Sequence, residues 1–159
     1  MNKTYLLLGS NLGNSLSLLS IAIEQIEKQI GTVIIQSGLY LTAAWGNTQQ
    51  PDFLNQVIVV STPLDATTIL QSILSIEKSM GRIRSVKNAP RVIDIDILFF
   101  NREIIARPEL TVPHPEIKNR RFVLTPLHEI APLMIHPSLD KTIEELLLQC
   151  PDTLEVKKN

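Results

Sequence analysis

The chain has 159 residues, of which 44% are hydrophobic and 19% are charged, and its formal net charge is -1. These values are ordinary for one soluble globular domain and argue against a strongly basic nucleic-acid binder, although they leave room for a local basic patch. A single cysteine excludes an internal disulfide and a zinc site built from several cysteines. No apolar run approaches the about 18 residues of a membrane span, so we expect a cytoplasmic protein with no membrane partner.

The spacing of apolar residues predicts one domain, residues 1–159, in which strands alternate with helices. In chain order the predicted elements are a strand at 4–8, a helix from Ser15 to Gly31, an extended segment at 32–42, a strand at 53–61, a helix ending at Gly81, a strand at 92–100 and a short strand at 103–106. Two further short helices are expected within 122–132 and 140–150, and residues 155–159 are expected to fray.

The order of the first six elements is β-α-β-β-α-β. This order is typical of the ferredoxin-like fold, an α+β architecture in which an antiparallel sheet carries both helices on one face. The two later helices could cover the other face. We therefore predict a three-layer α-β-α arrangement around a βαββαβ core.

Two aspartates, Asp94 and Asp96, interrupt the most apolar predicted strand, "VIDIDILFF". Side chains alternate across a sheet, so the two carboxylates share one face, separated by roughly 6.6 Å along the strand. Burying two like charges together is costly unless a cation compensates them, and Mg²⁺ prefers a few carboxylates together with phosphate oxygens. A magnesium site is the favoured interpretation. A solvent-exposed edge strand is the alternative.

The segment before this strand, "GRIRSVKNAPR", contains Arg82, Arg84, Lys87 and Arg91 and no acidic residue. Arginine side chains clamp phosphate oxygens, so cations beside a carboxylate pair indicate a polyphosphate substrate. A solvated basic loop that only neutralises its neighbours is the other interpretation.

A second basic cluster lies in "LTVPHPEIKNRRF", where His114 stands between two prolines and Arg120 precedes Phe122. His114 could contact a phosphate or nucleotide, or it could be structural. Aromatic residues make up only 4% of the chain, so Phe53 and Phe122 are candidates to stack on a flat ring as well as core residues. Asn55 would face the same side as Phe53 and could hydrogen-bond such a ring, and Thr42 could do so from the neighbouring strand.

Five segments together resemble one family. "LLLGSNLGN", "PDFLNQV", "IEKSMGRIR", "APRVIDIDILFF" and "LTVPHPEIKNRRFVLTPLHEIAP" occur in the order and spacing of the 6-hydroxymethyl-7,8-dihydropterin pyrophosphokinases. The resemblance covers essentially the whole chain, and its PRxxDxDI and VPHxxxxxR motifs are highly specific. It implies the ferredoxin-like fold and a folate-pathway enzyme. Such enzymes transfer the diphosphate of ATP to the pterin hydroxymethyl group and release AMP.

The resemblance also implies roles for individual residues. Asp94 and Asp96 match the pair that holds two Mg²⁺ ions, and Arg82 and Arg91 match arginines of the catalytic loop. Pterin-site positions are matched by Thr42, Phe53, Asn55 and Phe122, and positions around ATP by Glu77, Arg84, Ile97, Thr111, His114 and Arg120. The expected partners are ATP and 6-hydroxymethyl-7,8-dihydropterin, with no nucleic acid, and we expect a monomer.

One departure concerns the catalytic loop. Some members carry Arg-Trp-Gly before the Pro-Arg pair, whereas this chain has "KNA" and a loop one residue shorter. No tryptophan can close over the site from that loop, and Trp45 is the candidate to replace it as a pterin contact.

Two rival functions remain open on the residues alone. A magnesium-dependent nucleotidyl transferase with a polymerase-like Asp-x-Asp would release pyrophosphate and prefer nucleic acid, which the net charge of -1 disfavours. A nucleotide-sensing module would bind ATP without turnover, and it gives no reason for the paired aspartates. The fold alone could not decide among these functions.

Overall fold

The computed structural model describes residues 1–43, 51–81 and 92–159. Its elements, in chain order, are β1 (Asn2–Ser10), α1 (Ser15–Gln29), β2 (Thr32–Gln36), β3 (Tyr40–Thr42), β4 (Phe53–Thr62), α2 (Ala66–Ser79), β5 (Asp94–Phe100), β6 (Ile105–Ala106), β7 (Thr111–Val112), a 3₁₀ helix (Ile117–Asn119), α3 (Arg121–Ile130), β8 (Ile135–His136), β9 (Lys141–Thr142), α4 (Ile143–Gln149) and β10 (Val156–Lys158). None of the helices in these ranges is long and apolar enough to cross a bilayer.

The main sheet has the strand order β10-β3-β4-β1-β5, and β2 also pairs with β4. Every pairing in it is antiparallel. The long strand β4 pairs with β3 near its start and with β2 near its end, so β2 and β3 follow one another along the same edge. The α+β prediction with a ferredoxin-like order of elements is confirmed.

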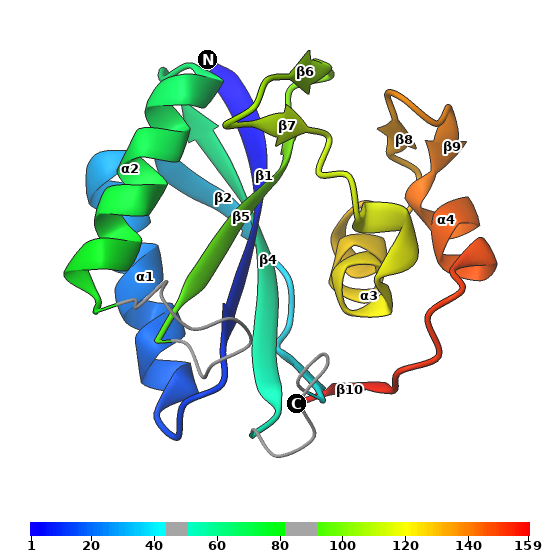
Figure 1. Ribbon diagram of the computed structural model, residues 1–159, viewed down its shortest axis with the longest axis horizontal. Helices are drawn as coiled ribbons and strands as arrows, with labels where there is room; N and C mark the ends of the chain where they lie inside the picture. Colours follow the sequence, from blue (N-terminus) through cyan, green and yellow to red (C-terminus); the bar gives the residue numbers. More distant parts are fainter. Residues whose placement is uncertain (44–50, 82–91) are drawn as a thin grey trace.

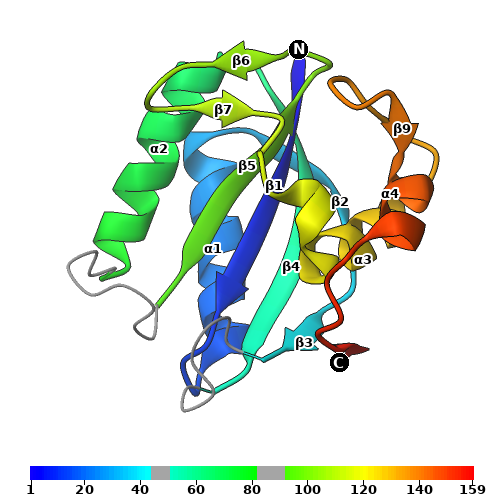
Figure 2. The same ribbon diagram turned by 45° about the vertical axis from the view of Figure 1, so that its right-hand side comes forward.

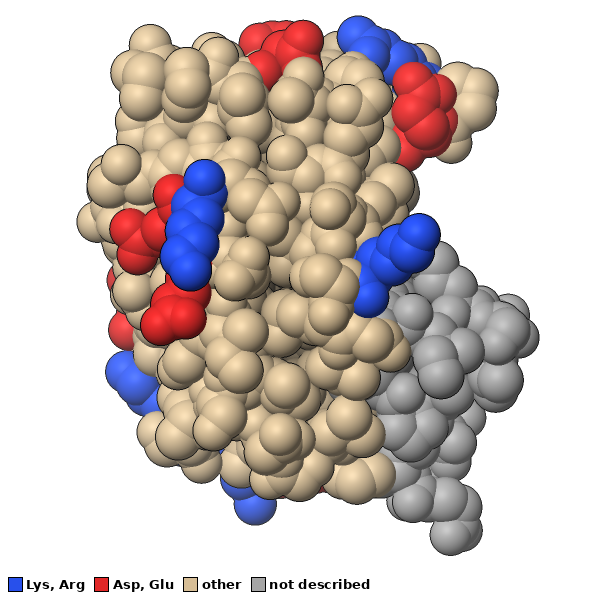
Figure 3. All heavy atoms as spheres, turned by 90° about the vertical axis from the view of Figure 1, so that its left-hand side faces the viewer, with Lys and Arg blue, Asp and Glu red and all other residues tan. Residues whose placement is uncertain are grey.

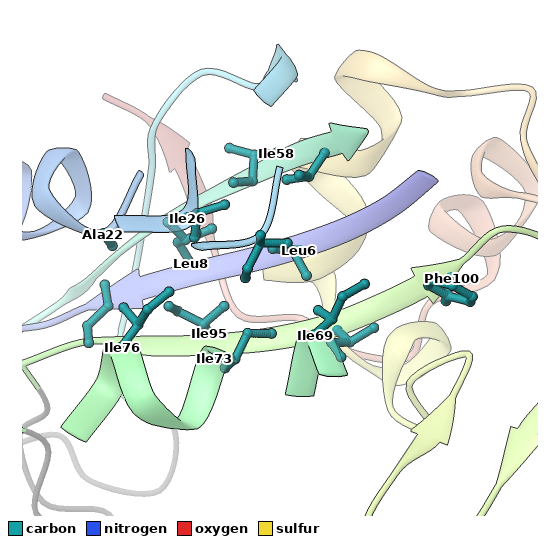
Figure 4. Packing of buried hydrophobic residues seen from close by; sticks show 14 of the residues in the cluster. Leu6, Leu8, Ala22, Ile26, Ile58, Ile69, Ile73, Ile76, Ile95 and Phe100 are labelled. Carbon is teal, nitrogen blue, oxygen red and sulfur yellow. The ribbon is translucent and has the colours of Figure 1, made fainter. Parts of the chain in front are cut away.

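Helices cover both faces of the sheet, as predicted (Figures 1 and 2). Helices α1 and α2 pack on one face through a core rich in leucine and isoleucine, part of which Figure 4 shows around Leu6, Ile26 and Ile73. Helices α3 and α4 pack on the other face through a second core that contains Tyr5 and Phe99. Strands β1, β4 and β5 place apolar side chains on both faces of the sheet, which is how a sheet buried on both faces is built.

An irregularity near the end of β5 changes which residues face each core. The register with β1 shifts between the pairs Leu6–Ile97 and Tyr5–Phe99. The extra residue is a β-bulge, and it turns Leu98 and Phe99 toward the same core. The strict alternation therefore holds only from Ile93 to Ile97, the part of the strand that carries the two aspartates.

The predicted fraying of residues 155–159 is wrong. Residues 156–158 form β10, which pairs antiparallel with β3, and the backbone N–H of Asn159 donates to the carbonyl of Leu39 at 2.8 Å. The segment is polar and has no apolar periodicity of its own. Its order comes from backbone pairing with a distant strand edge.

Candidate active site

The carboxylate pair lies on β5, the last strand of the main sheet in the described residues. Asp94 pairs with Gly9 and Asp96 with Leu7 of β1. Both aspartates are half-buried, whereas Ile95 between them is 5% exposed and belongs to the core under α2. The predicted alternation is confirmed: the isoleucine anchors the strand and the two carboxylates share the opposite face.

Glu77 fixes the backbone between the two aspartates. It lies one turn after Ile73 in α2, on the side of the helix that faces the sheet, and it is 1% exposed. Its Oε2 accepts a hydrogen bond from the backbone N–H of Ile95 at 2.9 Å. A hydrogen bond away from water is electrostatically stronger than one in water, so this buried contact holds the strand segment that presents Asp94 and Asp96.

A row of paired residues crosses four strands at the level of Asp94. Gly9 of β1 pairs with Asp94 on one side and with Asn55 of β4 on the other, and Asn55 pairs with Tyr40 of β3. Adjacent strands are about 4.8 Å apart, so the backbones of Asp94 and Asn55 lie about 10 Å from each other. The carboxylate pair and Asn55 therefore border a single site, with Gly9 between them.

Gly9 is required by close packing. A Cβ atom at this position would lie 2.8 Å from Oδ1 of Asn55 and 3.7 Å from the ring of Phe53. The sequence predicted that the first strand stops before Gly9, but β1 continues to Ser10. A glycine inside a strand often marks a place where another group approaches the backbone closely, and this signal could have identified Gly9.

The predicted ring-binding residues of β3 and β4 come together. The amide of Asn55 donates to the hydroxyl of Thr42 at 3.3 Å, and both side chains are almost fully buried. Phe53 is half-buried, two residues before Asn55, and contacts the same Gly9 surface. These three residues form a compact polar and aromatic group on the face covered by α3.

Phe122 lies on the same face of the sheet, in the first turn of α3. It is half-buried and packs against the second core. The guanidinium carbon of Arg120, the residue just before the helix, lies 5.8 Å from the centre of the Phe122 ring, within the range of a cation–π contact. The first turn of α3 thus brings an aromatic ring and a cation together.

His114 lies next to β5. Its backbone N–H donates to the carbonyl of Leu98, and its ring Nδ1 accepts from the backbone N–H of Glu116 at 3.2 Å. Burial, followed by the nearby charge of Arg120, lowers the pKa of His114, although Glu116 raises it. The ring is therefore neutral at pH 7 and, with Nδ1 accepting, carries its proton on Nε2 as a donor.

The remaining residues expected around ATP differ in how exposed their side chains are. Thr111 is exposed on β7, where it can meet a ligand. The side chain of Ile97 is 5% exposed and belongs to the core under α2, so only its backbone on the edge strand is available. Glu77 is also buried and bonded to Ile95, which fits a positioning role better than a direct contact.

Arg82, Arg84, Arg91 and Trp45 lie outside the described residues. Their predicted roles stay predictions.

The donor set fits magnesium. The described residues contain no group of three or more His, Cys, Asp or Glu side chains able to hold a metal ion. A site of two half-buried carboxylates matches the way Mg²⁺ is held in phosphoryl-transfer sites, where one or two carboxylates act together with water and substrate phosphates.

Comparison with known proteins identifies the family. A model of the 7,8-dihydro-6-hydroxymethylpterin-pyrophosphokinase family matches residues 5–132. The 2-amino-4-hydroxy-6-hydroxymethyldihydropteridine pyrophosphokinase of Methylorubrum extorquens is 40% identical over 136 residues, which cover 85% of this chain and 86% of that protein. The protein of the same name from Aquifex aeolicus is 41% identical over 145 residues, covering 91% and 90%.

Two longer proteins also match. The folic acid synthesis protein FOL1 of Dictyostelium discoideum is 40% identical over 153 residues, and the chain spans only 23% of its length. The solved HPPK-DHPS structure of Plasmodium falciparum has a TM-score of 0.76 at 21% identity, over 94% of this chain and 43% of that one. That likeness supports the fold alone. The family match and the relatives of similar length show that the chain belongs to the 7,8-dihydro-6-hydroxymethylpterin-pyrophosphokinase family.

Proposed function

We propose that this chain transfers the β,γ-diphosphate of ATP to the hydroxymethyl group of 6-hydroxymethyl-7,8-dihydropterin and releases AMP, a step of folate synthesis. The observation that carries the proposal at the level of residues is the row Asp94–Gly9–Asn55. It sets a carboxylate pair and a ring-binding group about 10 Å apart on one face of the sheet. A flat ring bound over Asn55 can then point its hydroxymethyl group toward phosphates held near Asp94 and Asp96.

The ring-binding residues orient the pterin. Phe53 and Phe122 contact its two faces, and Asn55 and Thr42 hydrogen-bond its polar edge from a pair that is already formed. Trp45, which lies outside the described residues, is a further proposed contact of the pterin ring. Holding both reactants in a fixed orientation removes an entropic part of the barrier, which is the main contribution a protein makes to phosphoryl transfer.

Asp94 and Asp96 would hold two Mg²⁺ ions, which when bound neutralise phosphate charge and tie the phosphates to the protein. The neutral Nε2–H of His114 donates to ATP, and Arg120 adds a positive charge beside it. The ATP side also includes Arg84, Thr111 and the backbone of Ile97. Glu77 contributes to it indirectly, through its bond to Ile95. Arg82 and Arg91 contribute positive charge to the phosphates as the bond between α- and β-phosphates breaks.

In the reaction the pterin hydroxyl oxygen forms a bond to the β-phosphorus. The bond between that phosphorus and the oxygen bridging to the α-phosphorus breaks, and AMP leaves with this oxygen. The hydroxyl proton is released. We propose that the chain does this as a monomeric cytoplasmic protein of one domain.

The test is an assay of products. Protein, Mg²⁺, ATP and the reduced pterin alcohol are mixed, and nucleotides and pterins are separated. AMP and pterin diphosphate in equal amounts are expected. Pyrophosphate as the product would support the nucleotidyl-transferase alternative, and bound but intact ATP would support a sensing module.

The outer face formed by α1 and α2 does not support binding of nucleic acid. Its visible described surface carries scattered charges of both signs (Figure 3), and no continuous basic stripe.

A further inference from the structure

The last eight residues, 152–159, contact helix α3, which carries Phe122, and strand β3, which carries Thr42. The family match ends at residue 132, and nothing in the sequence motifs assigns a role to this segment. In Figures 1 and 2 the chain passes from α4 along α3 and ends beside β3. Its contacts fall into two groups, one at the start of α3 and one on β3.

The first group caps α3. Asp152 is 8% exposed, and its Oδ2 accepts from the backbone N–H of Arg121, the first residue of the helix, at 3.0 Å. The guanidinium Nε of Arg121 returns a bond to the backbone carbonyl of Asp152 at 3.0 Å. The second carboxylate oxygen, Oδ1, accepts from the backbone N–H of Leu154. A carboxylate at a helix N-terminus satisfies otherwise unpaired N–H groups, so Asp152 fixes the turn that carries Phe122.

The second group pairs β10 with β3. Val156 lies opposite Thr42 and Lys158 lies opposite Tyr40. On its other edge β3 pairs with β4, where Thr42 is opposite Phe53. The tail thus forms the outer neighbour of the strand that carries Thr42.

Glu129, near the C-terminal end of α3, ties the same strand to the helix a second time. Its Oε1 accepts from the hydroxyl of Tyr40 at 2.6 Å and from the backbone N–H of Gly38 at 3.0 Å. Its Oε2 lies 3.6 Å from Nζ of Lys158 in the tail. Burial and the bond to Glu129 raise the pKa of Tyr40 to about 12, so the phenol remains a donor through the physiological range.

These contacts set a limit on the width of the site. Three residues lie between Asp152 and Val156, so the two residues are four steps apart along the chain and at most about 14 Å from each other when it is fully extended. The start of α3 and the Thr42 segment of β3 are therefore tethered at a bounded distance. A planar ring in contact on both faces needs its flanking aromatic rings about 7–8 Å apart, because each contact is optimal at 3.5–4.0 Å.

We propose that residues 152–158 act as a positioning strap that sets the gap between Phe122 on α3 and the Thr42–Asn55–Phe53 group on the sheet, and so sets the affinity for the pterin. Asp152 is the anchor of this strap on α3 and β10 is its anchor on β3. The inference rests on the proposed pterin-binding function. It assigns to a segment outside the motifs a role in binding one of the two substrates.

Two variants test the strap. Asp152→Asn keeps the size of the side chain but removes one of two acceptor oxygens, and a chain ending at Glu155 lacks β10. For each we would measure the dissociation constant of the pterin by fluorescence, KM for both substrates, and the thermal midpoint. We expect pterin affinity to weaken about tenfold in each variant, which is the size of effect expected when a charge-assisted hydrogen bond is lost or when the segment it holds becomes less ordered. The KM of ATP should stay within about twofold of the original.

Asp65→Ala is the matched control. It removes a carboxylate cap from α2, where Asp65 accepts from the N–H of Thr68 at 2.8 Å, and should lower the thermal midpoint without changing pterin affinity. Unchanged pterin affinity in both strap variants would overturn the strap, as would equal weakening of ATP and pterin binding. If the original chain binds pterin but makes no AMP, the proposed reaction fails while the strap is still judged by binding. A chain that binds no pterin overturns both.

Discussion

Gly9 lies between the carboxylate pair and the group of Thr42, Phe53 and Asn55, and its missing side chain decides how close Asn55 can come. A Cβ at this position would lie 2.8 Å from the amide oxygen of Asn55, well inside a normal contact. Gly13, four residues later in the same segment, has nothing within 4 Å of such an atom. The two glycines therefore offer a matched comparison.

We expect Gly9→Ala to push the Asn55 side chain out of its bond with Thr42 and to raise the KM of the pterin about tenfold, equivalent to roughly 1.4 kcal/mol. Gly13→Ala should leave both substrate constants unchanged. Steady-state kinetics with each substrate varied in turn would measure this. Equal effects of the two substitutions would show that space beside Asn55 is not what the glycine provides.

At the scale of elements, the bond from Ile95 to Glu77 joins α2 to the edge strand β5. Both residues are buried, so removing the acceptor leaves an unpaired backbone N–H away from water. We expect Glu77→Ala to lower the free energy of unfolding by about 1–3 kcal/mol and to lower kcat, because Asp94 and Asp96 flank the freed residue. Glu77→Gln retains an oxygen acceptor and should lose less of both. Denaturant titration and kinetics of the two variants measure the difference. An unchanged stability of Glu77→Ala would contradict a stabilising role for the bond between Glu77 and Ile95.

The elements that the sequence predicted well are those whose evidence is local. The alternation around Asp94 and Asp96 is visible in five consecutive residues, and α2 shows its apolar face at helical spacing. Strand β10 was missed because its residues are mainly polar and its order depends on β3. The contact of Tyr40 with Glu129 joins residues far apart in sequence, and no pattern within either segment predicts it.

The residues of the candidate site also divide into those predicted from local motifs and those whose surroundings depend on distant contacts. Motifs predicted the carboxylates and the residues for ring binding, and the structure places Thr42, Asn55 and Phe53 close together. The burial of Glu77 and the side-chain burial of Ile97 could not be read from the motifs, since burial depends on how α2 packs on the sheet. In the structure Glu77 is bonded to the backbone of Ile95, and the side chain of Ile97 packs in the core under α2.

At the scale of the whole molecule, two histidines make stability depend on pH. Burial lowers the pKa of His114 and of His136 in the fold. The unfolded chain binds these protons with an ordinary pKa near 6.5, so the stabilisation is complete above that value and is lost as pH falls through the lower folded pKa values. The thermal midpoint should therefore decrease as the pH falls below about 6.5.

His136 allows this to be checked away from the site. Its Nδ1 accepts from the N–H groups of Ser138 and Leu139, and asparagine can place an oxygen acceptor at a similar position without titrating. We expect His136→Asn to flatten the decline of the midpoint with pH, whatever its effect at about pH 8. An identical slope in the variant would show that His136 does not contribute.

In the proposed function, metal binding and ring binding take place side by side on one face of the sheet. Asp96→Asn removes one carboxylate charge from β5 and leaves the group of Thr42, Phe53 and Asn55 intact. The exposed Asp140, in the β8–β9 connection, gives a control, Asp140→Asn, with the same chemical change.

The most direct measurement is the rate of AMP formation by Asp96→Asn at increasing Mg²⁺, together with its pterin dissociation constant. We predict that kcat falls roughly a hundredfold or more, as when one electrostatic stabiliser of a transition state is removed, while pterin affinity stays within about twofold and Asp140→Asn behaves as the original chain. An Asp96→Asn protein that turns over at the original rate would contradict the assignment of the carboxylate pair.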